Sequence, residues 1–103
     1  MDATVHWDLP DVDENGDSLD PRDVAGVMVE LRVAGGNFSE LQPLVPRDTL
    51  QHTTEDLEVG DWEFRLTAIG TNGKASPTPV VEAFYVPSAA APGPVLNTRV
   101  VLS

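Results

Sequence analysis

Hydrophobic and polar side chains alternate strictly over residues 62–68, WEFRLTA. A period of two is typical of a β-strand that buries one face in a core and leaves the other in solvent. The apolar positions of this strand are Trp62, Phe64, Leu66 and Ala68. We therefore expect residues 62–68 to form a half-buried strand in a sandwich of β-sheets.

Other segments carry apolar side chains at alternate positions or between turn residues, which predicts further strands. These segments are residues 4–9, 27–33, 38–45, 49–54 and 80–86. Pro43 and Pro46 interrupt the third segment, and this favours a short strand at a sheet edge. The residues that we expect in the core are Trp7, Val29, Leu31, Leu57, Trp62, Phe64 and Leu66.

The last predicted strand, residues 80–86, is apolar on both faces. If Val81 and Tyr85 face inward, Phe84 joins Ile69 and Met28 on the outer face of the sheet. Such a cluster on an otherwise acidic surface predicts a contact patch. The alternative is a set of scattered surface apolar residues, which are common in soluble proteins.

The stretch LEVGDWEFRLTA, residues 57–68, resembles the LxxGxYxFRVxA segment that leads into strand F of bacterial and phage fibronectin type III modules. The resemblance implies an all-β, fibronectin type III-like (immunoglobulin-like) antiparallel sandwich. Residues 4–9 would be its strand B, with Trp7 as the core tryptophan. In this family a corner tyrosine bonds through its hydroxyl to upstream backbone. Trp62 stands there, and its indole N–H can donate but not accept, so we expect its packing role to be kept and leave that hydrogen bond open.

The resemblance implies a module over residues 1–86 that lacks its usual first strand, because only Met1 to Ala3 precede strand B. Residues 87–94, PSAAAPGP, have the composition of a stiff, extended linker. Residues 95–103 then alternate again, with Leu96, Val100 and Leu102 on one face.

An unpaired strand edge exposes backbone groups that another strand can satisfy. We therefore predict that residues 95–102 form an extra C-terminal strand that pairs with the edge of their own sheet or that of a neighbouring copy. On this prediction Met28, Ile69, Phe84, Leu96, Val100 and Leu102 are interface residues. The alternative is a tail that is disordered alone or docks on a different protein.

Composition narrows the class of partner. Six Lys plus Arg against seventeen Asp plus Glu give a net charge of −11 over 103 residues, a length typical of one domain. A field of this sign repels phosphate backbones and anionic membranes, so we expect neither nucleic acid nor membrane as a partner. The chain has no cysteine, and no apolar run has the length of a secretory signal or a membrane span.

The acidic segment 11–23 is the best candidate for metal binding. It opens as D-x-D-x-N-G, the start of a calcium loop, and the candidate ligands are Asp11, Asp13, Asn15 and Asp17. The twelfth position of an EF-hand loop needs a bidentate glutamate, and Arg22 stands there. A weak calcium site and a solvated acidic loop are the two interpretations.

The sequence offers no catalytic constellation. We expect His6 to face outward and His52 inward, and a zinc site also lacks its other ligands. No Ser-His-Asp set, phosphate-binding glycine loop or acid/base carboxylate pair can be assembled, so we expect neither enzymatic activity nor a cofactor.

These features favour a structural protein of a virion, as a capsid decoration or head/tail assembly part of a tailed bacteriophage. Its partners would be other virion proteins or copies of itself. Bacterial modules of this family usually belong to secreted multidomain proteins, so a single module without an export signal is expected to be made in the host cytoplasm and released by lysis. The alternatives are a glycan- or host-surface-binding module, for which Phe38 is the best exposed aromatic, and a piece of a larger secreted protein.

Overall fold

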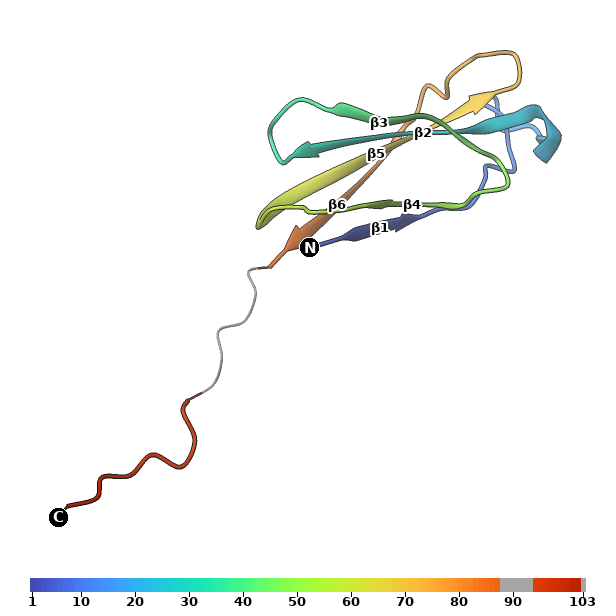
Figure 1. Cartoon of the computed structure of the whole chain (residues 1–103). Coiled ribbons are helices and arrows are strands. Elements are labelled where there is room, and N and C mark those ends of the chain that lie inside the picture. The colour runs from blue at the N-terminus through green and yellow to red at the C-terminus, as the bar shows by residue number, and fades with distance from the viewer. Residues whose placement is uncertain (88–93, 103) are drawn as a thin grey trace.

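The computed structural model describes residues 1–87 and 94–102, and within them the chain is built from β-strands. A four-stranded antiparallel sheet, in the order β3-β2-β5-β6, lies over a two-stranded antiparallel sheet of β1 and β4 (Figure 1). The predicted all-β architecture with two antiparallel sheets is confirmed. The strands are β1 Ala3–His6, β2 Val24–Val33, β3 Ser39–Pro46, β4 Gln51–Thr54, β5 Gly60–Gly70 and β6 Val80–Val86, and a short 3-10 turn, η1 Pro21–Asp23, precedes β2.

The core lies between the two sheets and is centred on β2 and β5. Leu31 pairs with Phe64 and Val29 with Leu66, so their apolar side chains share the inner face. Val29 is fully buried, and Leu31, Leu57 and Phe64 are buried around it. The other expected core residues, Trp7, Trp62 and Leu66, are partly buried and pack against this cluster. The described part of the chain holds no helix of the length and apolarity needed to cross a membrane.

Trp62 makes a side-chain hydrogen bond to upstream backbone, which the sequence alone did not decide. Its indole Nε1 donates to the backbone carbonyl of Glu58, four residues upstream, at 2.9 Å. Only a donor is needed for this contact, so an indole can make it without a hydroxyl. The aromatic residue therefore ties the start of β5 to the loop that precedes it.

In β6, Phe84 faces the core, whereas Val81 and Tyr85 face outward, which is the opposite of the orientation that would place Phe84 on the outer face. Phe84 pairs with Trp62 in β5 and therefore points to the inner face. Its ring stacks on that of Phe64 with the centroids 4.9 Å apart. Tyr85 is 61% exposed and Val81 46% exposed on the outer face. The predicted outer cluster of Phe84, Ile69 and Met28 is wrong, because the register with β5 decides between two faces that are both apolar.

The C-terminal segment forms no strand within the single chain. Residues 94–102 have no regular secondary structure, and the side chains of Val95, Leu96, Val100 and Leu102 are 81 to 91% exposed. The predicted extra strand is thus not formed on the chain's own sheet, and pairing with a second copy stays a prediction. Residues 88–93 of the expected linker lie outside the described residues.

Because Phe84 faces inward and Tyr85 outward, substitution of each by alanine should lower the free energy of unfolding by different amounts. Phe84→Ala should lower the free energy of unfolding by about 2 to 3 kcal/mol, below the range for a fully buried phenylalanine because the ring is only partly buried. Tyr85→Ala should change it by less than about 0.5 kcal/mol, as for most exposed positions. Urea unfolding at pH 7 measures both, and equal losses would contradict the orientation of β6.

Candidate functional site

The smaller sheet has an open edge. β1 pairs with β4 along one side only, and no other described strand lies along its second side. The N–H and C=O groups on that side are therefore available to a further strand. β1 is continuous with the core through Val5, whose partner across the sheet is His52 on β4.

A groove runs beside this edge, between β1 and the inner face of β5 and β6. It is open to solvent and has a volume of about 1440 Å³. Its presence follows from the unequal sheets, because two strands cannot cover the inner faces of four. Among the residues that line it are Trp7, Leu66, Ile69, Val80, Glu82 and Phe84.

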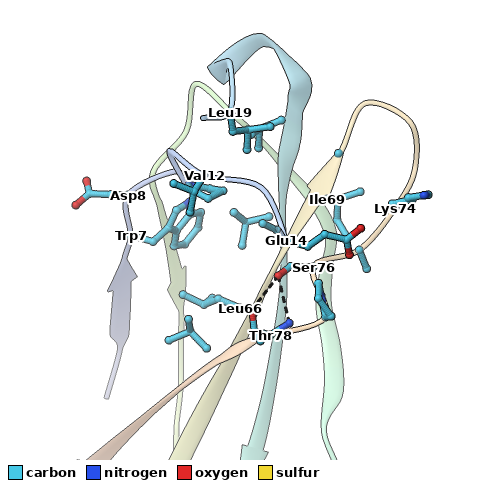
Figure 2. A pocket seen from close by; sticks show the side chains of 18 of the residues that line it. Trp7, Asp8, Val12, Glu14, Leu19, Leu66, Ile69, Lys74, Ser76 and Thr78 are labelled. Atoms are coloured by element: carbon cyan, nitrogen blue, oxygen red, sulfur yellow. Dashed lines mark hydrogen bonds between the residues drawn. The ribbon is translucent and has the colours of Figure 1, made fainter. Parts of the chain in front are cut away.

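The floor of the groove is apolar and incompletely covered. Phe84 and Leu66 are partly buried, while Val80, on the same inner face of β6, is 58% exposed. Figure 2 shows Trp7 at the end of β1 and Leu66 from β5 on opposite sides of this space. The Trp7 Nε1 atom is buried and has no hydrogen-bond partner among the described residues. The groove therefore offers both exposed apolar surface and an unsatisfied polar atom in its wall.

Two loops close one end of the groove. The loop after β1 folds back through a bridge between Val12 and Ser18. The connection from β5 to β6 lies across from it, and there the Thr78 backbone N–H donates to the Ser76 hydroxyl at 3.3 Å (Figure 2). Acidic side chains, Asp8 and Glu14 among them, lie at this rim. The site thus combines an apolar floor with an acidic end.

The structure does not bring the calcium candidates together. The Asp13 carboxylate accepts the backbone N–H groups of Asn15, at 2.8 Å, and of Asp17, at 3.0 Å. The loop is therefore held by its own hydrogen bonds, as an Asx turn. Within residues 1–87 and 94–102, no three His, Cys, Asp or Glu side chains are placed to hold a metal ion, and Asp11 joins no such group.

The two histidines lie on different faces of the small sheet. His6 is exposed, whereas His52 is partly buried on the face that it shares with Val5. Their positions match the orientations expected from the sequence, and the two imidazoles do not converge.

The outer face of the large sheet carries a second cluster, which the sequence analysis missed. Arg65 on β5 donates two hydrogen bonds of 2.8 Å to the carboxylate of Glu30 on β2. Arg32 on β2 reaches Glu63 on β5 at 3.3 Å. The pairs follow from the register, which sets Glu30 opposite Arg65 and Arg32 opposite Glu63. The signal was present in the polar positions of the two predicted strands, but their pairing was needed to see it.

Phe38 completes this cluster. The guanidinium carbons of Arg32 and Arg65 lie 4.3 Å and 4.2 Å from the centroid of its ring. A ring that already contacts two cations has less of its face available for a sugar. The residue expected to be the best exposed aromatic for glycans is therefore partly buried against the sheet.

The ion pair between Glu30 and Arg65 shifts the pKa of both groups away from their usual values. The hydrogen bonds from Arg65 lower the pKa of Glu30, and those to Glu30 raise the pKa of Arg65. The Glu30 side chain is 12% exposed. The pair thus favours the charged form of the carboxylate in the folded protein.

No protein-family model, curated protein or solved structure significantly matches this chain. Its function must therefore be argued from the groove, the ion-pair cluster and the exposed C-terminal segment.

Lowering the pH should test the role of Glu30 in stability. Because its pKa is lower in the folded state, its contribution is complete above the pKa of a free glutamate, about 4.3, and is lost as the pH falls through the lowered value. Glu30→Gln should destabilise the protein at pH 7 and reduce the loss of stability between pH 5 and pH 3, measured by urea unfolding.

Glu40→Gln is the matched control, since Glu40 lies opposite Glu30 on β3 and makes no ion pair among the described residues. This variant should keep the acid sensitivity of the unaltered protein. The assignment fails if Glu30→Gln and the unaltered protein lose the same stability over that range.

Proposed function

We propose that this protein is a non-enzymatic structural protein that assembles through protein–protein contacts and strand addition, as a part of a virion. The observation that carries the proposal is the open edge of β1 beside an apolar groove, in a chain that also presents a strand-like segment to solvent. A strand added at such an edge gains main-chain hydrogen bonds, and alternate side chains gain a surface to pack on.

We also infer a fibronectin type III-like module, in which none of the described strands takes the place of the family's first strand. The inference is supported by the motif at residues 57–68 and by the order of the strands. In the family's terms β1 and β4 would be strands B and E, and β2, β5 and β6 would be C, F and G. The groove would then occupy the place of that first strand, next to B and over the inner face of G.

A place in a virion is supported by the combination of small size, negative charge and surfaces suited to assembly. A net charge of −11 keeps separate copies soluble and disfavours contact with nucleic acid. The open edge of β1 and the apolar groove beside it supply those surfaces. We place the protein in a tailed bacteriophage particle, on the capsid or at the junction of head and tail, with other virion proteins or its own copies as partners.

The second candidate function is binding of glycans or of a host surface. Tyr85 supports it, because a tyrosine that is 61% exposed can stack on a sugar ring. Phe38 does not support it, because its ring is occupied by two guanidinium groups. We rank this function below assembly.

The proposed function predicts that the protein stays with purified virions. Particles banded by density from lysates of the producing cells should contain the protein after a wash in 1 M salt (about a 3 Å screening length, enough to release contacts held by surface charge alone), as read by mass spectrometry.

Recovery only in the soluble fraction would contradict a virion role. Retention on a polysaccharide resin together with absence from particles would favour the glycan-binding alternative. A matched test with Tyr85→Ala separates the two, since that variant should lose glycan binding and remain on virions.

A further inference from the structure

We propose that the groove beside β1 is the acceptor for residues 95–102 of a second copy of this chain, which would lie in it as an added strand. This inference rests on the proposed function and names its partner. The donor would place Leu96, Val100 and Leu102 against the floor of the groove. Thr98 would share this face, and the side chains of Val95, Asn97, Arg99 and Val101 would face solvent.

The donor segment has apolar side chains that lack a covering surface. Leu96 is 81%, Val100 86% and Leu102 91% exposed in the single chain. Three such side chains on one face of an alternating segment are costly to leave in water, since each buried aliphatic side chain stabilises a complex. The floor of the groove offers apolar surface from Leu66, Phe84 and the exposed Val80, and it also contains Glu82.

The lengths of donor and acceptor agree. Eight residues in a strand extend over about 26 Å at about 3.3 Å per residue, and β6, with seven residues, over about 23 Å. An added strand of this size can therefore cover the inner face of β6 from end to end. It would also extend past β1, which has four residues.

The position at which the chain leaves β6 favours a second copy over the same chain. Val86 pairs with Gly60, and Met1 exchanges backbone hydrogen bonds with Leu57, so β6 ends where β1 begins. A segment that folded back from Pro87 along β1 would run parallel to it. Every named strand pair in the described structure is antiparallel, and a segment from another copy can enter the groove in that direction.

The composition of the connecting stretch points the same way. Pro87, Pro92 and Pro94 make its composition typical of an extended spacer. In the single chain residues 94–102 accordingly form no strand and remain exposed.

Charge is complementary as well. The segment carries Arg99 and no acidic side chain, so the rest of the chain has a side-chain net charge of −12, against −11 for the whole. The rim of the groove includes Asp8 and Glu14, and Glu82 lies on its floor between Val80 and Phe84. An incoming donor is therefore attracted to the acceptor, whereas two modules without donors repel each other.

The donor and the acceptor are different surfaces, so each copy can give its segment to one neighbour and receive that of another. Such a heterologous contact yields a ring or a filament, and reciprocal exchange yields a closed dimer.

Two full-length variants test the exchange, each with a matched control. Val100→Asp disables the donor, and Val101→Asp alters the opposite face of the same segment. Val80→Asp disables the acceptor, and Val81→Asp alters the outer face of the same strand. Val80 and Val81 are 58% and 46% exposed, so both variants of β6 should fold.

Mass in solution, measured by light scattering over a concentration series, gives the readout. The unaltered protein and both controls should self-associate. Each disabling variant should bind its own copies more weakly by a factor of about 10 to 100, as expected when a buried aliphatic contact is replaced by a charge. An equimolar mixture of Val100→Asp and Val80→Asp should form a dimer, because one retains the acceptor and the other the donor.

Three outcomes would overturn the inference. A monomeric unaltered protein at every concentration excludes exchange between copies, and equal effects of the disabling and control variants exclude the assigned faces. A mixture that remains monomeric excludes the pairing of this donor with this acceptor. None of these results depends on recovery of the protein in virions, so failure of the exchange is distinguishable from failure of the virion role.

Discussion

The pairing of β2 with β5 is the constraint on which the rest of the structure depends. Its register places Leu31 beside Phe64 on one face and Glu30 beside Arg65 on the other. One alignment thus builds the core and the ion-pair cluster together. A shift by one residue would move both sets to the wrong face, so apolar burial and charge pairing select the same register.

Unequal sheets are the second determinant of the architecture. Two strands lie against four, and the uncovered part is the inner face of β6 with the neighbouring part of β5. Glu82 and Val80 are exposed there although they point toward the opposite sheet. The same shortage leaves β1 with an unpaired edge, so backbone groups and apolar side chains in need of a partner lie next to each other.

The sequence predicted the strands well because most alternate on one face only. Residues 80–86 match β6, and the predicted edge strand at 38–45 became β3, Ser39–Pro46. The orientation of β6 could not be predicted, since Val81 and Tyr85 are as apolar as Phe84 and only the register with β5 decides. For the same reason the sequence predicted the open strand edge, but it did not predict that Val80 lies in the floor of the groove beside that edge.

The ion-pair cluster shows a different limit. Glu30, Arg32, Glu63 and Arg65 alternate along the sequence with the apolar positions of their strands, which predicts an outer face for them. Which carboxylate meets which guanidinium depends on alignment to a single residue. Phe38 comes from outside the strands, and its contact with Arg32 and Arg65 requires the path of a turn that periodicity does not describe. Local patterns therefore predict faces, whereas partners across the sheet need the three-dimensional structure.

The order of the elements along the chain has a consequence for how an assembly would stop growing. Every strand that forms the groove precedes residues 95–102. A molecule without residues 95–102 would therefore keep the acceptor and lose the donor. Such a molecule would end a chain of copies, because it could receive a strand but give none.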